Sequence, residues 1–489
     1  MSKFLIAVLL GLVGCTAPGK SVRLEHQSEA TVSVSGKVSA PPGLGGTPQT
    51  GNLAVYWLTP VEFDDLQNGR HVIRTVVHVM ERTQSFAAVD LSKAPVQFSS
   101  MVSPGPVLLF GILDRKGEFL ATLMQEGGAG NLVGMTELVN AGTASTTEVR
   151  LVLGQQVPEH PVKERCSGER LRLERVRAPQ VAGARGTSVD RRLCVYLPPS
   201  YEANPARKYP VIYSLPGLSS RDTGGKFFEI GQNIKALAPL GVEAIVVGVD
   251  TQSRWGSTYL TSSPTAGDFE SFLARDVVQF VDQHYRTRAE PSERALVGHS
   301  TGGFNAISFA LRYPDVFQVA VASSPDALDL ENWLFGSDGK AKAPILAWMR
   351  VEDTFGPPGQ MVSYAADWSP NGKGGFRWPV RLDTGERISE VWQQWKAASP
   401  IEMLKQPAIR DAAKKSLSRR IYITASPSDE AWLFEPARRF SEALTDAGIV
   451  HTFATDNHGH FTDERREREM VFFTLSAFKE AASESDHGK

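Results

Sequence analysis

The sequence lacks the features that mark a membrane channel, a nucleic-acid binder or a disulfide scaffold. Only three of its 489 residues are cysteine, and 52 lysines and arginines face 54 aspartates and glutamates, for a net charge of −2. This balance gives no bulk attraction for nucleic acid. No long apolar run follows the first 15 residues, which excludes a multi-span membrane protein. The 43 glycines and 30 prolines are too few for a low-complexity chain, so we expect a globular body with a distinct front end.

That front end is typical of an export signal. The apolar run at 4–13 is too short to cross a bilayer as a helix but suits a secretory signal. It leads into LVGC at 12–15, which resembles the lipobox of bacterial lipoproteins. The resemblance implies a signal peptide at 1–14, acylation of Cys15 and a polar tether at 15–29. The alternatives are an uncleaved signal anchor, or an ordinary signal peptide with an incidental cysteine.

An acylated Cys15 would anchor the protein at the bacterial cell envelope. Several acyl chains on one cysteine are enough for stable attachment to a membrane. Because Thr16, not aspartate, follows the cysteine, we expect the outer membrane in a Gram-negative cell. We expect no nucleic-acid partner, and the sequence does not determine the oligomeric state.

The other two cysteines, Cys166 and Cys194, are a candidate disulfide. An even pair in an exported protein favours a bond, and each cysteine lies in a stretch that has the character of a strand. The alternative is two separate buried thiols. Their number and spacing indicate no metal site.

Residues 30–154 have the pattern of a small β domain. The β-rich runs, separated by glycine and proline, are 32–38, 53–58, 72–80, 107–113, 118–124 and 149–153. Six or seven short strands of this kind predict a β-sandwich, with a linker at 155–165. No catalytic constellation lies here, although Tyr56, Trp57 and His78 could line a ligand-binding face.

Residues 166–489 alternate between strand and helix patterns. The apolar runs that predict strands are 209–214, 244–249, 295–297, 319–322, 421–424 and 452–453. This alternation predicts an α/β domain in which helices cover a parallel-rich sheet. The stretch at 330–408 interrupts it and holds six tryptophans, too many for a disordered segment. We expect an insertion whose core these tryptophans form; the alternative is that they bind an apolar or ring-bearing substrate group.

The strongest chemical signal is GHSTGG at 298–303. It follows a short strand and opens a helix, the context in which G-x-S-x-G forms a nucleophile elbow. Such a turn is sharp and strained, so a Cβ at the flanking positions would collide with nearby backbone. Ser300 is therefore the predicted nucleophile.

The acid and the base should follow the nucleophile in that order. Asp429, just after a predicted strand, is our choice of acid; Glu430 beside it is an alternative, and Asp326 on the preceding strand is less favoured. His460, in the loop after the final strand, is the predicted base, and a register error of two residues would substitute His458. The two histidines lack the further ligands that a metal site needs.

Taken in order, these motifs resemble the putative-esterase branch of the α/β-hydrolases, which holds enterochelin, feruloyl and acetyl-xylan esterases, S-formylglutathione hydrolases and mycolyltransferases. Besides the elbow, the matching stretches are VYLPPSY at 195–201, YPVIY at 209–213, GDFE at 267–270, YRT at 285–287 and RYPDVF at 312–317. The resemblance implies the α/β-hydrolase fold, the triad Ser300, Asp429 and His460, and no cofactor.

The resemblance also implies an oxyanion hole made by the backbone N–H groups of Thr301 and Leu218. Many relatives carry His-Gly where this chain has Pro-Gly at 216–217, so the shape of that loop is a point of difference. The predicted function is an exported, membrane-anchored serine esterase that acts on small or polymer-linked carboxylic esters. The alternatives are an acyltransferase of the same fold, or an inactive surface lipoprotein that binds through its β-sandwich.

Overall fold

The computed structural model describes residues 31–41, 49–68, 72–115, 131–142, 147–157, 165–218, 220–224, 226–238, 241, 243–461 and 463–487. The predicted signal peptide, Cys15 and the tether lie outside these ranges. The chain divides into two compact units, 1–161 and 162–489, with 353–355 grouped with the first. Among the helices of the described ranges, none combines the length and the apolar character that a membrane span needs.

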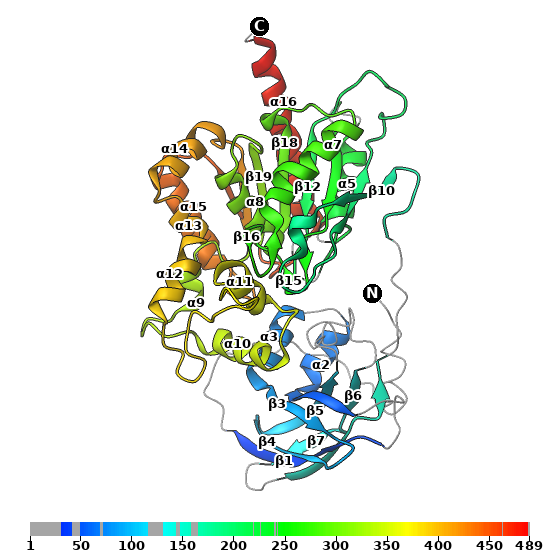
Figure 1. Cartoon of the computed structure of the whole chain (residues 1–489), viewed down its shortest axis with the longest axis vertical. Coiled ribbons are helices and arrows are strands. Elements are labelled where there is room, and N and C mark those ends of the chain that lie inside the picture. The colour runs from blue at the N-terminus through cyan, green and yellow to red at the C-terminus, as the bar shows by residue number, and fades with distance from the viewer. Residues whose placement is uncertain are drawn as a thin grey trace. The chain divides into compact units, whose positions relative to one another are not determined.

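The first unit contains two β-sheets around one apolar core (Figure 1). The smaller sheet has the order β4 (Val96–Val102), β1 (Val32–Ser39), β8 (Thr147–Val152). The larger has the order β3 (Gln84–Asp90), β2 (Thr50–Leu58), β5 (Gly105–Asp114), β6 (Leu132–Met135), β9 (Gln155–Gln156), and β7 (Val139–Ala141) pairs with β5. Val38 of one sheet and Leu53 of the other lie in the same core, so the unit has the layers expected of a sandwich.

The strand predicted at 72–80 is wrong, because these residues belong to helix α3 (Val72–Arg82), which follows α2 (Pro60–Gln67). Val76, Val79 and Met80 are buried at a spacing of three and four residues, which places them on one helical face. The β-branched residues of this stretch favour a strand, but its buried residues recur with the spacing of a helix, and the stretch forms one. The predicted run at 118–124 lies outside the described residues.

The ligand face suggested by Tyr56, Trp57 and His78 is not formed. Tyr56 and Trp57 are each 5% exposed, and the ring of Tyr56 stacks on that of Phe110. His78 lies on α3, where its Nδ1 is 2.6 Å from a carboxylate oxygen of Glu62. The two aromatic residues therefore belong to the core of the unit.

The second unit is an α/β domain around an eight-stranded sheet, as predicted (Figure 1). The strand order is β10 (Leu171–Arg177), β11 (Asp190–Tyr196), β13 (Ile245–Val249), β12 (Val211–Leu215), β18 (Arg294–His299), β19 (Val319–Ser323), β20 (Ile421–Ala425), β21 (Thr452–Thr455). The first two strands are antiparallel to their neighbours, and the six from β13 to β21 are parallel. The carboxyl ends of these six strands therefore meet at one edge of the sheet.

Helices cover both faces of this sheet. On one face, α5 (Phe227–Leu237) and α16 (Glu464–His487) pack against Ile212 and its neighbours. On the other face, toward which Tyr213 points, aromatic contacts join the sheet to α8 (Thr301–Arg312). Both faces of the central strands are thus buried, which explains their continuous apolar sequences.

Cys166 and Cys194 form a disulfide, with their Cα atoms 5.6 Å apart. Cys194 lies in β11, but the expectation that Cys166 also lies in a strand is wrong. Cys166 precedes a turn in which Gly168 has φ = +151°, and β10 begins only after that turn. A glycine supplies that backbone conformation without steric cost, so the chain reverses here before it enters the sheet.

The tryptophan-rich stretch at 330–408 folds into helices. These are α9 (Leu330–Leu334), α10 (Ala343–Phe355), α11 (Gln360–Trp368), α12 (Ser389–Ala397), α13 (Pro400–Met403) and the beginning of α14 (Pro407–Ser416). Five of its six tryptophans are buried, and only Trp378 is partly exposed. Trp368 packs against Tyr364 and Trp395, so most of the indole rings serve as internal packing of the stretch.

Two carboxyl groups are buried beside this packing. Burial raises the pKa of Glu352 to about 7, although its oxygens accept the backbone N–H groups of Gln360 and Val362 at the start of α11. Burial likewise raises the pKa of Asp367 to about 7; its oxygens accept the backbone N–H of Tyr259 and the hydroxyl of Thr261. Both groups hold a proton in the folded protein at a pH where the unfolded chain has lost it.

The free energy of unfolding should therefore fall as pH rises from about 4 to about 7, by up to about 1.4 kcal/mol per pH unit for each group. Asp367→Asn removes one titrating group while its amide can keep both hydrogen bonds. We expect the variant to have a shallower slope than the unchanged protein, as measured by urea unfolding across this pH range. Near pH 3.5 the two proteins should be about equally stable, because both side chains are then neutral. An unchanged slope would contradict the prediction.

Candidate active site

Ser300 occupies a strained turn between β18 and α8. Its φ is +56° and its ψ is −123°, a conformation that a residue with a Cβ rarely adopts. The turn is possible because its neighbours are small: a Cβ on Gly298 would lie 2.2 Å from the carbonyl carbon of Gly302. A Cβ on Gly302 would lie 2.1 Å from the backbone oxygen of Leu215. The sequence therefore needs glycine at both positions to present the serine at the edge of the sheet.

The main chain of Ser300 is held by the last residue of β19 and by the loop that follows it. Its N–H donates to the backbone oxygen of Ser323 at 3.0 Å, and its carbonyl oxygen accepts the N–H of Asp326 at 3.0 Å. Ser324, between these two residues, has φ = +38° and donates its N–H to the backbone oxygen of Thr424. The strained backbone of Ser300 is thus held in place by hydrogen bonds from a segment that itself contains a strained residue, Ser324.

Asp429 and His460 meet in a buried hydrogen bond. Nδ1 of His460 lies 2.9 Å from Oδ2 of Asp429, and the exposed fractions of the two side chains are 4% and 0%. Asp429 follows β20, and its other oxygen accepts the N–H of Ala431 at 2.8 Å. With Nδ1 bound to the carboxylate, Nε2 of the imidazole is the nitrogen left to exchange a proton with another group.

The His460 ring also lies beside the serine turn. Its centroid is 4.9 Å from that of His299, the residue directly before Ser300. Burial disfavours charge on His460, but the carboxylate of Asp429 outweighs this effect, and the pKa of the imidazole is raised above its ordinary value. Burial holds the pKa of His299 well below its ordinary value, so that ring stays neutral next to His460.

The alternative residues have other partners. Glu430 accepts the backbone N–H of His460 at 2.9 Å, so it contacts the loop of that histidine rather than its ring. The side chain of His458 is half exposed, and its Nε2 lies 3.0 Å from a carboxylate oxygen of Asp463. The carboxylate of Asp326 accepts hydrogen bonds from Gln360 of the insertion and from the hydroxyl of Tyr259. Of the predicted residues, the structure brings Asp429 and His460 into direct contact.

The loop that carries Leu218 lies beside the serine. A Cβ on Gly217 would be 3.7 Å from Cβ of Ser300 and 3.3 Å from the backbone oxygen of His299. Thr301 begins α8, so its N–H belongs to the positive end of that helix. The two predicted oxyanion donors therefore come from segments that flank Ser300.

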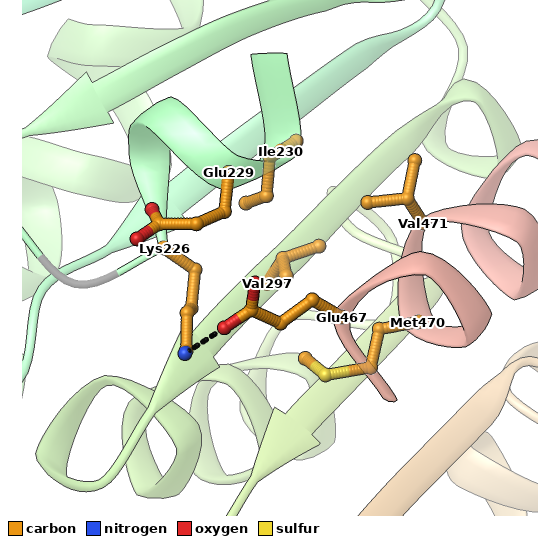
Figure 2. Close-up of a pocket in the computed structure, with 7 residues that line it drawn as sticks. All are labelled: Lys226, Glu229, Ile230, Val297, Glu467, Met470 and Val471. Carbon is orange, nitrogen blue, oxygen red and sulfur yellow. Dashed lines mark hydrogen bonds and ion pairs between the residues drawn. The ribbon is translucent and has the colours of Figure 1, made fainter. Parts of the chain in front are cut away.

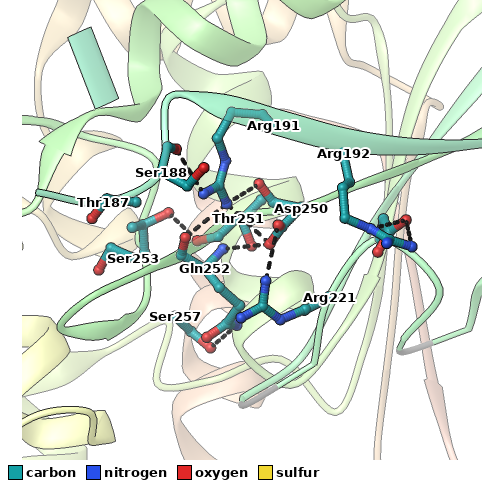
Figure 3. A network of polar contacts seen from close by, with 12 residues as sticks. Thr187, Ser188, Arg191, Arg192, Arg221, Asp250, Thr251, Gln252, Ser253 and Ser257 are labelled. Atoms are coloured by element: carbon teal, nitrogen blue, oxygen red, sulfur yellow. Dashed lines mark hydrogen bonds and ion pairs between the residues drawn. The ribbon is translucent and has the colours of Figure 1, made fainter. Parts of the chain in front are cut away.

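A polar network holds this loop against the end of β13 (Figure 3). Asp250, directly after that strand, lies 3.0 Å from Arg191 in a buried ion pair and 3.5 Å from Arg221. Nε2 of Gln252 donates to the backbone oxygen of Ser220 at 2.7 Å. The side chains shown in Figure 3 thus tie the loop that follows Leu218 to two strands of the sheet.

Sequence reasoning did not identify this network. A signal was present, since Asp250 comes directly after the buried apolar run at 244–249, as Ser300 follows its own strand. Nothing in the sequence pairs Asp250 with Arg191, because 58 intervening residues are brought together only by the antiparallel pairing of β11 and β13.

Two cavities lie apart from these residues. One, of about 10 Å³, lies between α5, α16 and β18, where Lys226 and Glu467 form an ion pair (Figure 2). It has room for a single water molecule and not for an ester. The other, of about 300 Å³, lies between α5 and the edge strands and is lined in part by Leu171 and Tyr196. Ser300 lines neither of them.

No group of three or more histidine, cysteine, aspartate or glutamate side chains within the described ranges is arranged to hold a metal ion. The chemistry available at the edge of the sheet is that of a hydroxyl, an imidazole and a carboxylate. Such a set can activate a serine for attack on a carbonyl carbon.

The sequence model of the family described as "Putative esterase" matches residues 185–464. The match covers more than half of the chain and contains Ser300, Asp429 and His460. It leaves out the first unit, which contributes none of these residues.

Several known proteins are similar to this chain. An esterase of Mycobacterium tuberculosis is 29% identical over 280 residues, which are 54% of this chain and 51% of that protein. An endo-1,4-beta-xylanase/feruloyl esterase of Xylanibacter ruminicola is 29% identical over 132 residues, 25% of this chain and 18% of that protein. The chain thus spans about half the length of the mycobacterial relative that it matches.

Solved structures of other proteins are similar to part of this chain. A ferulic acid esterase from Anaeromyces mucronatus has a TM-score of 0.39 at 17% identity, covering 65% of this chain and 96% of that one. The MPT51 protein of Mycobacterium tuberculosis has a TM-score of 0.43 at 13% identity, covering 64% of this chain and all of that one.

Proposed function

The chain belongs to the putative esterase family, and from this premise we propose that it is a serine esterase that forms an acyl-enzyme on Ser300. The observation that carries the proposal is the buried bond between His460 and Asp429 next to the strained turn of Ser300. A base oriented in this way, beside a serine at the start of a helix, is the arrangement that acyl transfer requires.

The mechanism assigns one role to each group. His460 accepts the proton of the Ser300 hydroxyl as Oγ attacks the ester carbonyl, and Asp429 stabilises the imidazolium that results. The N–H groups of Thr301 and Leu218 donate to the oxyanion of the tetrahedral intermediate. His460 then gives its proton to the leaving alcohol. Water, deprotonated by the same histidine, attacks the acyl-enzyme; as the bond to Oγ breaks and the carboxylic acid is released, His460 returns the proton to Ser300.

The reaction can be tested by labelling the full-length protein with a fluorophosphonate, which reacts with activated serines. We expect the intact mass to rise by one adduct and peptide mapping to place that adduct on Ser300. Incubation of the protein with an aryl ester, with and without an added alcohol, then separates hydrolysis from acyl transfer. Free acid as the product indicates an esterase, and a new ester indicates an acyltransferase. A folded protein that takes up no label would contradict the proposal.

The proposal includes export and a lipid anchor on Cys15, on the evidence of the sequence at 4–15. In bacterial cells the protein should be recovered in the membrane fraction and released by detergent. Cys15→Ser removes the thiol that would be acylated. We expect the variant to carry no lipid, so that its recovery in solution no longer depends on detergent. Equal lipid labelling of both proteins would contradict the anchor.

A further inference from the structure

Asp326 is a buried carboxylate that the proposed mechanism leaves unused. It is 1% exposed and follows β19, the strand next to that of the nucleophile. Its backbone N–H donates to the carbonyl oxygen of Ser300 at 3.0 Å, so it is attached directly to the strained turn. A buried carboxylate is costly unless hydrogen bonds or nearby positive charge compensate it.

Neutral donors satisfy this carboxylate. Oδ2 accepts the hydroxyl of Tyr259 at 2.9 Å and Nε2 of Gln360 at 2.8 Å. Oδ1 accepts the backbone N–H of Ala327 at 3.0 Å. Within the described part of the chain, all three of these donors to Asp326 are neutral groups. Hydrogen bonds from neutral donors, rather than an ion pair with these groups, therefore surround the carboxyl group of Asp326.

The donors themselves are held firmly. Gln360 begins α11, and its backbone N–H donates to the buried carboxyl group of Glu352. The backbone N–H of Tyr259 donates to Asp367, and the ring of Tyr259 stacks on that of Tyr364 at 4.2 Å. The loop behind the nucleophile thus receives two fixed donors, Gln360 from the insertion and Tyr259 from the segment between β15 (Gly256–Ser257) and β16 (Ser262–Ser263).

His460 is the group on which this charge acts. Burial disfavours its protonated form, while Asp429, Asp326 and Glu430 all favour it, and together they hold the pKa of His460 above its ordinary value. On the β18 side the ring faces His299, which is neutral because burial lowers its pKa far below the ordinary value, with Lys226 acting in the same direction on that group. Positive charge at His460 is thus met by negative charge from two separate loops.

We propose that Asp326 is a positioning residue of the esterase: its buried carboxylate fixes the loop that holds Ser300 and stabilises positive charge on His460 in the transition state. The proposal rests on the proposed function. It also assigns a role to the insertion at 330–408, which supplies Gln360 to this carboxylate. The second carboxylate would act together with Asp429, which orients the ring directly.

The experiment compares Asp326→Asn with the unchanged full-length protein. The amide has the same shape and no charge; its oxygen can accept from Tyr259 and Gln360, while its NH2 group replaces the oxygen that accepts from Ala327, so the pH profile and not kcat alone reports the loss of charge. We expect kcat on an aryl ester to fall by about tenfold with KM unchanged, since the charge acts in the transition state. We also expect the acid limb of kcat/KM to move to lower pH, because His460 loses an anion that favours its protonated form.

Asp329→Asn is the matched control. Asp329 is 3% exposed, caps α9 and pairs with Arg439, so its loss perturbs the same region without removing a charge that acts on His460. We expect the acid limb of kcat/KM against pH to be the same for this variant as for the unchanged protein. A fall in kcat for Asp326→Asn with an unmoved acid limb would overturn the inference. An unchanged protein that takes up no fluorophosphonate would overturn the proposed function as well, and labelling therefore tells the two failures apart.

Discussion

Ser300→Ala should reduce kcat on any ester substrate by about 10⁴- to 10⁶-fold, because the acyl-enzyme can no longer form. KM should change much less, since the substrate contacts and the oxyanion donors are left in place. The residual rate reflects binding and the oxyanion hole alone. Steady-state hydrolysis of an aryl ester and fluorophosphonate labelling measure the two consequences on one sample.

Ser308→Ala is the control for this variant. Ser308 lies on the same helix, α8, and its buried hydroxyl has no hydrogen-bond partner in the described part of the chain. Its removal should therefore leave both activity and labelling intact. If Ser300→Ala kept more than about one hundredth of the activity while folded, the nucleophile would have to be another residue, since a lost nucleophile costs far more than that.

His460→Ala should lower kcat by a similar factor of about 10⁴–10⁶, because the serine then has no base to accept its proton. His460 must be neutral to act, so activity should fall as pH drops through its pKa, which lies above the ordinary value for imidazole because Asp429 outweighs the effect of burial. The measurement is kcat/KM as a function of pH, and its acid limb should lie on the high side for a histidine.

His458→Ala tests the register of the base. This side chain is half exposed and pairs with Asp463, so its removal should change kcat less than threefold, as is usual for an exposed pair of this kind. If His458→Ala were the inactive variant and His460→Ala the active one, the assignment of the base would be off by two residues. If both were active, the triad itself would be wrong.

The repeated apolar runs of the second unit predicted its fold well. The stretches at 244–249, 295–297 and 421–424 are continuous in apolar residues because strands buried on both faces have no polar side, and each became a strand of the parallel sheet. The first unit was harder: valine and isoleucine at 72–80 favour strands in composition, and only the spacing of the buried residues revealed a helix.

The position of Cys166 shows the same limit at a smaller scale. The sequence predicted a strand at this cysteine, but a glycine with positive φ places a turn between it and β10. Turn geometry depends on a few backbone angles and leaves a weak trace in the pattern of side chains.

By itself, the sequence determined the nucleophile motif and the class of the sheet, and it predicted an acid and a base that follow the serine. The motif depends on residues close together in the chain, namely the glycines that a sharp turn requires at 298–303, and the class of the sheet on short apolar runs that are each local. Tertiary structure alone decided that Asp429 rather than Glu430 contacts the ring of His460, that the N–H of Asp326 binds the carbonyl oxygen of Ser300, and that Arg191 pairs with Asp250. These contacts join loops separated by dozens of residues, and a sequence does not record which way neighbouring side chains point once parallel strands bring their ends to one edge.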